Sequence, residues 1–153
     1  MKNQVSGYLF GSPNAQGVNT PLSISSGNTY YSRWINIEDV DSMIIEAAWT
    51  GTPTGIATLQ SAANVSSAYN NQFAAGGNVE GTTSANIYEA LGAGVTARIN
   101  DITTGSLAVI SPGGTASQNE VDFLSAPWRW VRIKLVVSAG SGTYTAFLFG
   151  KGA

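Results

Sequence analysis

The sequence contains no cysteine and no histidine. Without cysteine the chain has no disulfide bonds, no thiolate ligands for zinc and no cysteine nucleophile. Without histidine it lacks the Ser-His and Cys-His catalytic pairs and the imidazole ligands of many metal sites. Because these absences remove most hydrolase and metalloenzyme designs, we expect a protein that is not an enzyme, with no cofactor and no bound metal.

Charged residues of both signs are scarce. They make up 10% of the chain, against about 25% in an average soluble domain. The formal net charge of −2 argues against nucleic acid as a partner, since binding to phosphates depends on clustered basic residues. A surface with so little charge gives weak protection against association. We interpret it as a surface that is covered in an assembly, with a monomer coated by serine, threonine and asparagine as the alternative.

Long hydrophobic runs are also missing. Segments such as IKLVV and AFLFG are far too short to cross a membrane. The first ten residues, MKNQVSGYLF, contain one lysine and no apolar segment of the length expected in a signal peptide. The 153 residues are enough for one domain with a substantial core. We therefore expect a single domain and no membrane partner.

Short extended segments separated by frequent turn residues dominate the chain, while helical periodicity is rare. This pattern is typical of an all-β sandwich or barrel, and we predict a single antiparallel β-sandwich over residues 29–153. Residues 1–28 are predicted to form an N-terminal arm that reaches a neighbouring subunit, or an edge segment folded back on its own domain. The expected strands are residues 29–37, 41–50, 55–62, 86–91, 95–101, 106–110 and 120–124, with two long strands in 125–152.

Two segments of the chain have the same order of extended runs and turn. IIEAAWTGTPTGIATL (44–59) and IKLVVSAGSGTYTAFL (133–148) each place a glycine-containing turn between two extended runs. Glycine accepts positive φ and Pro53 fixes φ, so both turns close easily. We interpret both segments as β-hairpins.

The last third of the chain contains the main candidate surface. Side chains alternate across a strand, so Val131, Ile133, Leu135 and Val137 fall on one face of residues 130–137. We predict that this face lies in the core. We interpret the opposite face as the outer side of an ordinary amphipathic strand, with basic stems covering a tryptophan. An assembly or ligand surface is the alternative. The candidate surface consists of Trp128, Trp130, Arg132 and Lys134.

Acidic residues offer weaker candidates. Glu38, Asp39 and Asp41 supply the oxygen ligands that Ca²⁺ prefers, but their spacing matches no EF-hand loop, and we interpret them as a solvated turn. A glycosidase needs two carboxyl groups across a cleft, and nothing in the spacing pairs the carboxylates of this chain. The candidates for that role are Glu46, Glu80, Glu89, Glu120 and Asp122.

The aromatic residues have two interpretations. Trp34, Trp49, Trp128 and Trp130, with six tyrosines, would provide faces on which sugars stack. Each tryptophan, however, lies in or beside a predicted strand, a position that favours the core or a sheet edge.

Two motifs carry a family resemblance. WTGTPTG (49–55) is followed by PWRWVR (127–132) and by the turn SAGSGT (138–143). This order resembles a group of small bacteriophage virion proteins, in which a W-T-G-x-P-x-G hairpin precedes a P-x-R-x-[VI]-R strand and an SGSGT-type turn. The resemblance implies a jelly-roll-like β-sandwich that sits on the particle as a decoration, cement or fibre-associated subunit. Residues 1–28 lie outside it.

We therefore expect a non-enzymatic structural protein of the virion, most simply a capsid decoration or cement subunit that coats the particle by surface burial. Its partners would be a major capsid protein or a tail or fibre protein, and copies of itself in a homo-oligomer. The alternative is a carbohydrate-binding module of a host-recognition fibre, for which a glycan is the partner. That alternative predicts exposed aromatic residues near Tyr69, Phe73 or Trp128.

Overall fold

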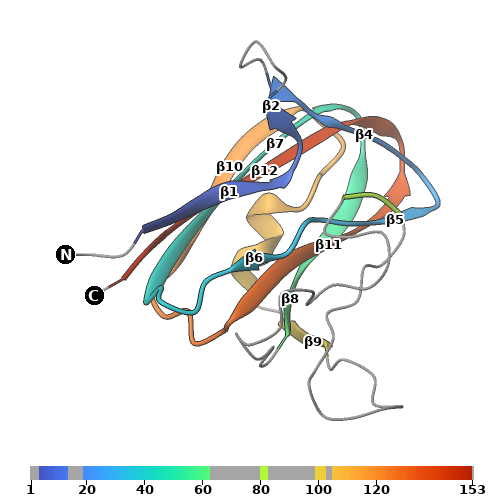
Figure 1. The fold of residues 1–153 in the computed structure, drawn as a ribbon. Coiled ribbons are helices and arrows are strands. Elements are labelled where there is room, and N and C mark those ends of the chain that lie inside the picture. The colour runs from blue at the N-terminus through green and yellow to red at the C-terminus, as the bar shows by residue number, and fades with distance from the viewer. Residues whose placement is uncertain (1–3, 14–18, 63–79, 83–98, 103–104, 153) are drawn as a thin grey trace.

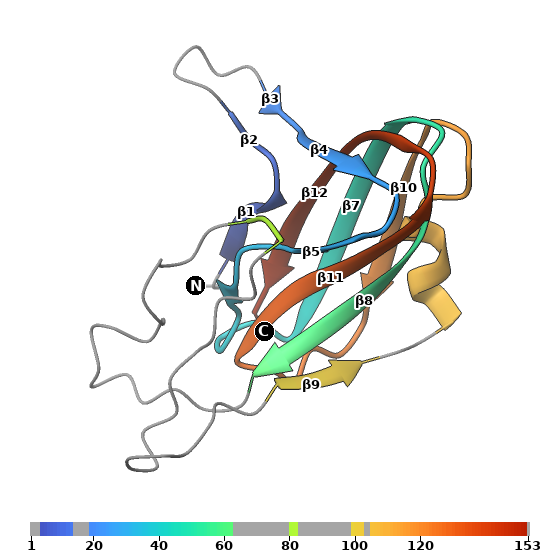
Figure 2. The same cartoon turned by 90° about the vertical axis from the view of Figure 1, so that its right-hand side faces the viewer.

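The computed structural model describes residues 4–13, 19–62, 80–82, 99–102 and 105–152. Two antiparallel sheets of five strands each pack face to face (Figure 1). Figure 2 shows the two layers, with β5, β11, β8 and β9 in one and β12, β7 and β10 in the other. The predicted all-β sandwich is therefore confirmed.

Each sheet is built from strands that lie far apart in the sequence. The first sheet has the order β1-β12-β7-β10, and β4 also pairs with β12. The second has the order β5-β11-β8-β9, and β6 also pairs with β11. The first sheet comprises β1 (Gln4–Phe10), β4 (Leu22–Ser25), β7 (Ser42–Gly51), β10 (Ser117–Phe123) and β12 (Ser141–Lys151). The second comprises β5 (Asn28–Tyr31), β6 (Ile35–Asn36), β8 (Thr54–Ala62), β9 (Ile99–Ile102) and β11 (Trp130–Ala139).

Three short elements complete the described chain. Strands β2 (Ser12–Pro13) and β3 (Asn19–Thr20) pair with each other, and a 3-10 helix, η1 (Gly105–Ile110), precedes β10.

The strand order is that of a jelly roll. Consecutive strands β4 and β5 pair with β12 and β11, and consecutive strands β7 and β8 pair with β10 and β9. The four pairs form one long antiparallel ribbon that folds over itself. The pairs β4–β12 and β7–β10 lie in the first sheet and the pairs β5–β11 and β8–β9 lie in the second, as in jelly rolls with two Greek keys. The expected jelly-roll-like sandwich is therefore what the chain forms.

The alternation of side chains along the long strands matches the sequence. In β7 the side chains of Met43, Ile45, Ala47 and Trp49 are buried between the sheets. Val131, Ile133, Leu135 and Val137 of β11 are at most 1% exposed, so the predicted core face of this strand is confirmed.

Two predicted strands differ from the structure. Residues 29–37 are divided into β5 and β6, because three residues follow Tyr31 before Ile35 while only two residues of β11 separate their partners, Lys134 and Val131. Residues 106–110 belong to η1 instead of a strand. Leu107 and Ile110 are buried while Val109 is exposed, a spacing of three that suits a 3-10 turn. The expected strand at 86–91, and residues 95–98 of the next one, lie outside the described residues.

The two predicted hairpins are wrong in their pairing. β7 and β8 do not pair with each other but belong to different sheets, and the same holds for β11 and β12. Each glycine-containing turn carries the chain from one sheet to the other. The two turns lie side by side, since Gly142 is paired with Gly51 and Ala139 with Thr54, and the Thr52 amide donates to the Ser141 carbonyl oxygen at 3.1 Å.

In the N-terminal segment, residues 1–28, strands β1 and β4 are part of the β-sandwich of the same chain. β1 pairs with β12 from Gln4 opposite Lys151 onward, and β4 pairs with the other end of β12. Leu9 and Phe10 are fully buried in the core, and Ile24 is 3% exposed. These described residues therefore lie along one edge of the sandwich of their own chain.

An aromatic cluster packs the core beside the paired turns. Tyr144 stacks on Trp49 with ring centroids 6.0 Å apart, and the edge of Phe10 meets it at 5.5 Å. The Tyr144 hydroxyl donates to the Ile110 carbonyl oxygen at 2.6 Å, and the Trp49 indole N–H donates to the Thr115 carbonyl oxygen at 2.7 Å. The polar groups of both aromatic side chains are therefore hydrogen-bonded within the protein. Burial raises the pKa of Tyr144 well above its ordinary value.

The paired turns leave no room for a side chain at Gly142. A Cβ there would lie 1.8 Å from the Thr50 carbonyl oxygen, so we expect Gly142→Ala to lower the free energy of unfolding by about 3 kcal/mol or more. Gly113→Ala is the matched control, because a Cβ at Gly113 meets nothing within 4 Å, and its effect should stay within about 0.5 kcal/mol. Urea unfolding of both variants measures the difference, and equal stabilities would contradict the close pairing of the turns.

Removal of the Tyr144 hydroxyl tests the core hydrogen bond. Tyr144→Phe leaves the Ile110 carbonyl without this donor and should cost about 1–3 kcal/mol at neutral pH. Because burial raises the pKa of Tyr144, the unfolded chain loses this proton first as the pH rises above about 10, and wild-type stability falls there. The stability difference between wild type and Tyr144→Phe should therefore shrink above that pH. Chemical unfolding at pH 7 to 11 checks it, and a constant difference would contradict the assignment.

Candidate functional site

The candidate surface predicted from the sequence is largely buried within the chain itself. Trp130 and Arg132 lie on the outer face of β11, as expected, yet they are only 8% and 1% exposed. Lys134, on the same face, is half-buried. Trp128 precedes β11 and packs against the core, where its ring meets the edge of Phe123 at 5.9 Å. The four residues therefore do not form one open surface.

Arg132 is held in a polar and aromatic cage on the outer face of the second sheet. Its guanidinium carbon lies 4.6 Å from the ring centre of Tyr31 and 4.5 Å from that of Trp34. Its Nε donates to Gln60 Oε1 at 2.7 Å, and Gln60 Nε2 donates to Asp101 at 2.7 Å. The cage thus connects β11 to β8 and β9 and to the segment that follows β5.

The electrostatics of this cage indicate a structural role. Burial lowers the pKa of Arg132 below its ordinary value, to about 10, an effect that the nearby Tyr31 and Asp101 oppose. The side chain is therefore still protonated at neutral pH, and cation–π contacts with two rings stabilise it. Trp34, Ala62 and Trp130 form a small apolar cluster beside it. A charge so enclosed by its own chain holds the sheet together and is not available to a ligand.

Trp128 borders a pocket at the end of the second sheet. The pocket has a volume of about 560 Å³ and is lined by Ser61, Ala62, Asn100, Ile102, Pro127, Trp128 and Arg129.

The acidic candidates are spread over the fold. Glu38 pairs with Arg129, and Glu80 pairs with Arg33 at 3.1 Å and accepts the Gly11 amide at 2.7 Å. Glu89 lies outside the described residues. In the part of the chain that the structure describes, no three acidic side chains gather as metal ligands.

Two carboxylates that the sequence did not pair are neighbours in the first sheet. Glu46 of β7 stands directly opposite Glu120 of β10 in the register, and both are exposed on the outer face. Directly opposed side chains have Cβ atoms about 5 Å apart, and like charges there repel. A general acid needs a carboxyl group shielded from water, so this open position suits binding better than catalysis.

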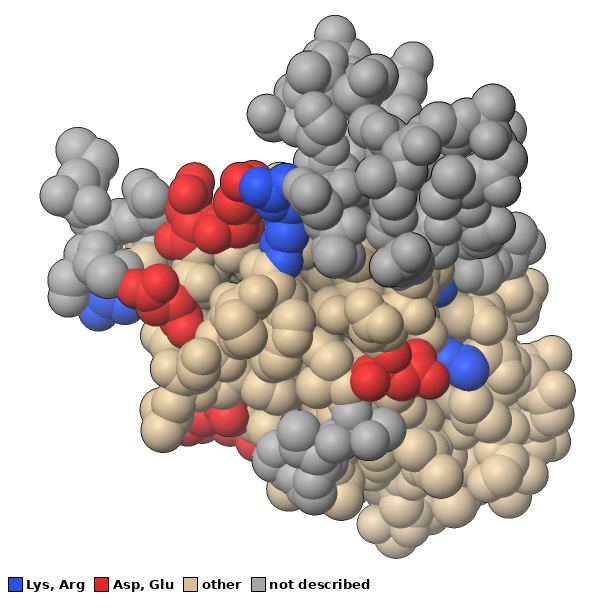
Figure 3. Space-filling view, turned by 90° about the horizontal axis from the view of Figure 1, so that it is seen from below, with Lys and Arg blue, Asp and Glu red and all other residues tan. Residues whose placement is uncertain are grey.

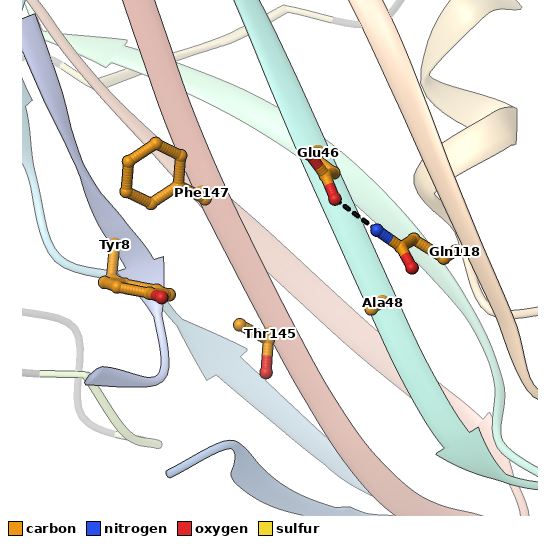
Figure 4. A pocket seen from close by; sticks show the side chains of 6 residues that line it. All are labelled: Tyr8, Glu46, Ala48, Gln118, Thr145 and Phe147. Carbon is orange, nitrogen blue, oxygen red and sulfur yellow. Dashed lines mark hydrogen bonds between the residues drawn. The ribbon is translucent and has the colours of Figure 1, made fainter. Parts of the chain in front are cut away.

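A trough lies next to these carboxylates on the outer face of the first sheet (Figure 4). Its volume is about 340 Å³, and four strands contribute to it. Ala48 and Thr145, two short side chains paired across β7 and β12, form the floor. Tyr8 and Phe147 lie on one side, and Glu46 and Gln118 lie on the other, joined by a hydrogen bond from the Gln118 amide to the Glu46 carboxylate.

Sequence reasoning missed this trough for a physical reason. Alternation shows that Thr145 and Phe147 share one face of their strand, and that Glu46 and Ala48 share one face of theirs. It does not show that β1, β12, β7 and β10 are neighbours, because that order follows from pairing between distant segments.

Comparisons of the chain with protein-family models, with curated proteins and with solved structures find no match. Among the described residues, no helix has the length and apolar character needed to span a membrane. The trough and the Arg132 cage are therefore interpreted from their own geometry.

The hydrogen bond between Gln60 and Arg132 can be tested through the free energy of unfolding. Gln60→Leu leaves the buried Arg132 Nε without its acceptor and should cost about 2 kcal/mol, in the range for hydrogen bonds to charged groups. The double variant Gln60→Leu/Arg132→Met removes both partners and should be more stable than Gln60→Leu alone, because no buried charge is left without its partner.

Thr58→Val is the matched control for this experiment. Thr58 is half-buried on the same strand as Gln60 and is paired with Lys134, so its replacement should change stability by less than about 0.5 kcal/mol. Urea unfolding gives all four values. If Arg132→Met lowered the stability of the Gln60→Leu variant by as much as an independent substitution of a buried side chain does, the coupling between Gln60 and Arg132 would be contradicted.

Proposed function

We propose that the chain is a non-enzymatic structural subunit of a virus particle, which coats a capsid or tail as a decoration or cement protein. The observation that carries this proposal is the distribution of exposed apolar side chains over both outer faces of the jelly roll. The jelly roll itself is a common fold of viral capsid domains and also of lectins, so the fold alone does not decide between these uses.

On the first sheet, the apolar patch consists of Ile44, Leu124 and Phe149. Ile44 and Phe149 are directly opposite each other in the register and are 38% and 41% exposed, while Leu124 is 91% exposed. The three border one shallow pocket of about 220 Å³. Contiguous apolar surface of this kind is typical of protein–protein contacts.

On the second sheet, Ile56 and Val136 form a smaller apolar pair. They face each other across β8 and β11 and are 68% and 39% exposed. Among the described residues on the face drawn in Figure 3, the charged side chains form small, separate groups. A subunit with exposed apolar side chains on both outer faces and few charged side chains is suited to contacts with more than one neighbouring protein.

The proposed mechanism is burial of surface against other virion proteins and against further copies of the chain. An interface of about 1,600 Å² holds a subunit without special chemistry, and several copies on one particle add avidity. The partners are a major capsid protein or a tail or fibre protein, and the location is the virion. The resemblance of the WTGTPTG, PWRWVR and SAGSGT segments to bacteriophage virion proteins supports the same proposal.

Particle incorporation tests this proposal. Particles encoded by the genome that carries this gene are purified on a density gradient, and the chain is quantified by mass spectrometry. Leu124→Asp should lower the copy number about tenfold or more, since burial of one leucine contributes about 1.5–3 kcal/mol. Ser125→Asp, at the exposed neighbour, is the matched control and should leave incorporation unchanged. Absence of the wild-type chain from purified particles would refute the proposal.

A further inference from the structure

We propose that the trough on the first sheet is a saccharide-binding site for neutral or amino sugars. The trough is lined by Tyr8, Glu46, Ala48, Gln118, Thr145 and Phe147. This inference goes beyond the structural role proposed above and does not depend on it, because the trough is complete within one copy of the chain.

The trough forms where two short side chains, Ala48 and Thr145, lie side by side among longer ones. Thr145, Ala48 and Gln118 are paired across β12, β7 and β10, and the next row along the strands contains Tyr8, Phe147 and Glu46. The small side chains Ala48 and Thr145 leave a depression that the longer side chains surround (Figure 4). Its volume of about 340 Å³ lies at the lower end of the usual range of ligand sites, about 300–1,000 Å³.

The aromatic side of the trough provides surface for the C–H groups of a sugar ring. Tyr8 and Phe147 lie in neighbouring strands with ring centroids 5.0 Å apart and an interplanar angle of 75°. Both are half-buried, so each ring is anchored in the sheet and still presents part of its surface. The edge-to-face contact orients the two rings before a ligand arrives.

The opposite side of the trough provides hydrogen-bonding groups for hydroxyls. One amide N–H of Gln118 donates to Glu46, which holds both side chains in place. A carboxylate accepts about four hydrogen bonds, and a glutamine amide has a second N–H and a carbonyl oxygen. This pair therefore offers acceptors and a donor beside each other, which matches the mixed donor and acceptor character of sugar hydroxyls.

The charge of the trough selects among saccharides. Glu46 and the directly opposed Glu120 place negative charge at its polar side, and none of the described residues that line it is basic. Acidic sugars are therefore repelled, and neutral sugars are accepted. An ammonium group of an amino sugar would reduce the repulsion between the two carboxylates.

The combination of an aromatic side, a polar side and a small floor favours a saccharide over a peptide. A pyranose has apolar C–H faces and a polar rim, so it matches both sides of the trough at once. An extended peptide would add to a sheet through unpaired backbone groups at an edge, whereas the trough lies across the middle of the sheet, where β12 and β7 are already paired on both sides.

The test uses ¹H–¹⁵N correlation spectra of the full chain during titration with defined oligosaccharides. The probes are cello-, malto- and manno-oligosaccharides, N-acetylglucosamine and glucosamine oligomers, and oligogalacturonate as the acidic control. We expect saturable shifts at residues of β1, β12, β7 and β10 around the trough with at least one neutral or amino sugar. Oligogalacturonate should give none.

Variants identify the site. Phe147→Ala should weaken binding about tenfold, which corresponds to about 1.4 kcal/mol. Gln118→Leu, at an exposed position of β10, should weaken it about fivefold through the lost hydrogen bonds with little effect on folding. Phe149→Ala is the matched control, since Phe149 lies two residues further along the same face of β12 and outside the trough, and it should change affinity less than twofold.

Three outcomes would overturn the inference. They are the absence of saturable shifts with every saccharide, shifts confined to the Trp128 pocket, and equal weakening by Phe147→Ala and Phe149→Ala. Particle incorporation of Phe147→Ala and Gln118→Leu keeps this result separate from the structural role. A chain that enters particles but binds no sugar refutes only the saccharide site, and a chain that binds sugar but never enters particles refutes only the structural role.

Discussion

The close pairing of the two turns that connect the sheets is the constraint on which the rest of the structure depends. The turn between β7 and β8 and the turn between β11 and β12 cross from one sheet to the other at the same end of the sandwich. Their backbones approach so closely that Gly51, Gly140 and Gly142 leave no space for a Cβ. Because β7 pairs with β12 and β8 with β11, this corner sets the register of the central strands in both sheets at once.

That register gives the two outer faces different properties. On the second sheet it brings Arg132 next to Gln60 and beneath aromatic rings, which encloses the charge within the chain. On the first sheet it places the short side chains Ala48 and Thr145 side by side, which opens a trough between aromatic and polar groups. Part of the second sheet's outer face therefore serves the protein's own cohesion, while the first sheet's outer face carries an open trough.

The fold was predictable from the sequence where a local rule decides the outcome. Alternation identified the buried faces of β7 and β11, because successive side chains of any strand point to opposite sides. The same rule misled at residues 106–110, where Leu107 and Ile110 reach the core from a 3-10 helix at a spacing of three. For the candidate surface, alternation assigned Trp130 and Arg132 to the outer face correctly, but it does not show what covers an outer face, and in this chain Tyr31 and Trp34 do so for Arg132.

The sequence by itself determined the class of fold, the core face of the long strands and the absence of cysteine and histidine chemistry, since these depend on composition and local periodicity. Only the tertiary structure decided that the apparent hairpins cross between sheets, that Glu46 faces Glu120, and that Tyr8, Phe147 and Gln118 surround one trough. The physical reason is that these contacts join segments far apart in the chain. Hydrogen bonds between backbones pair strands regardless of side-chain identity, so a local pattern cannot specify which strands become neighbours.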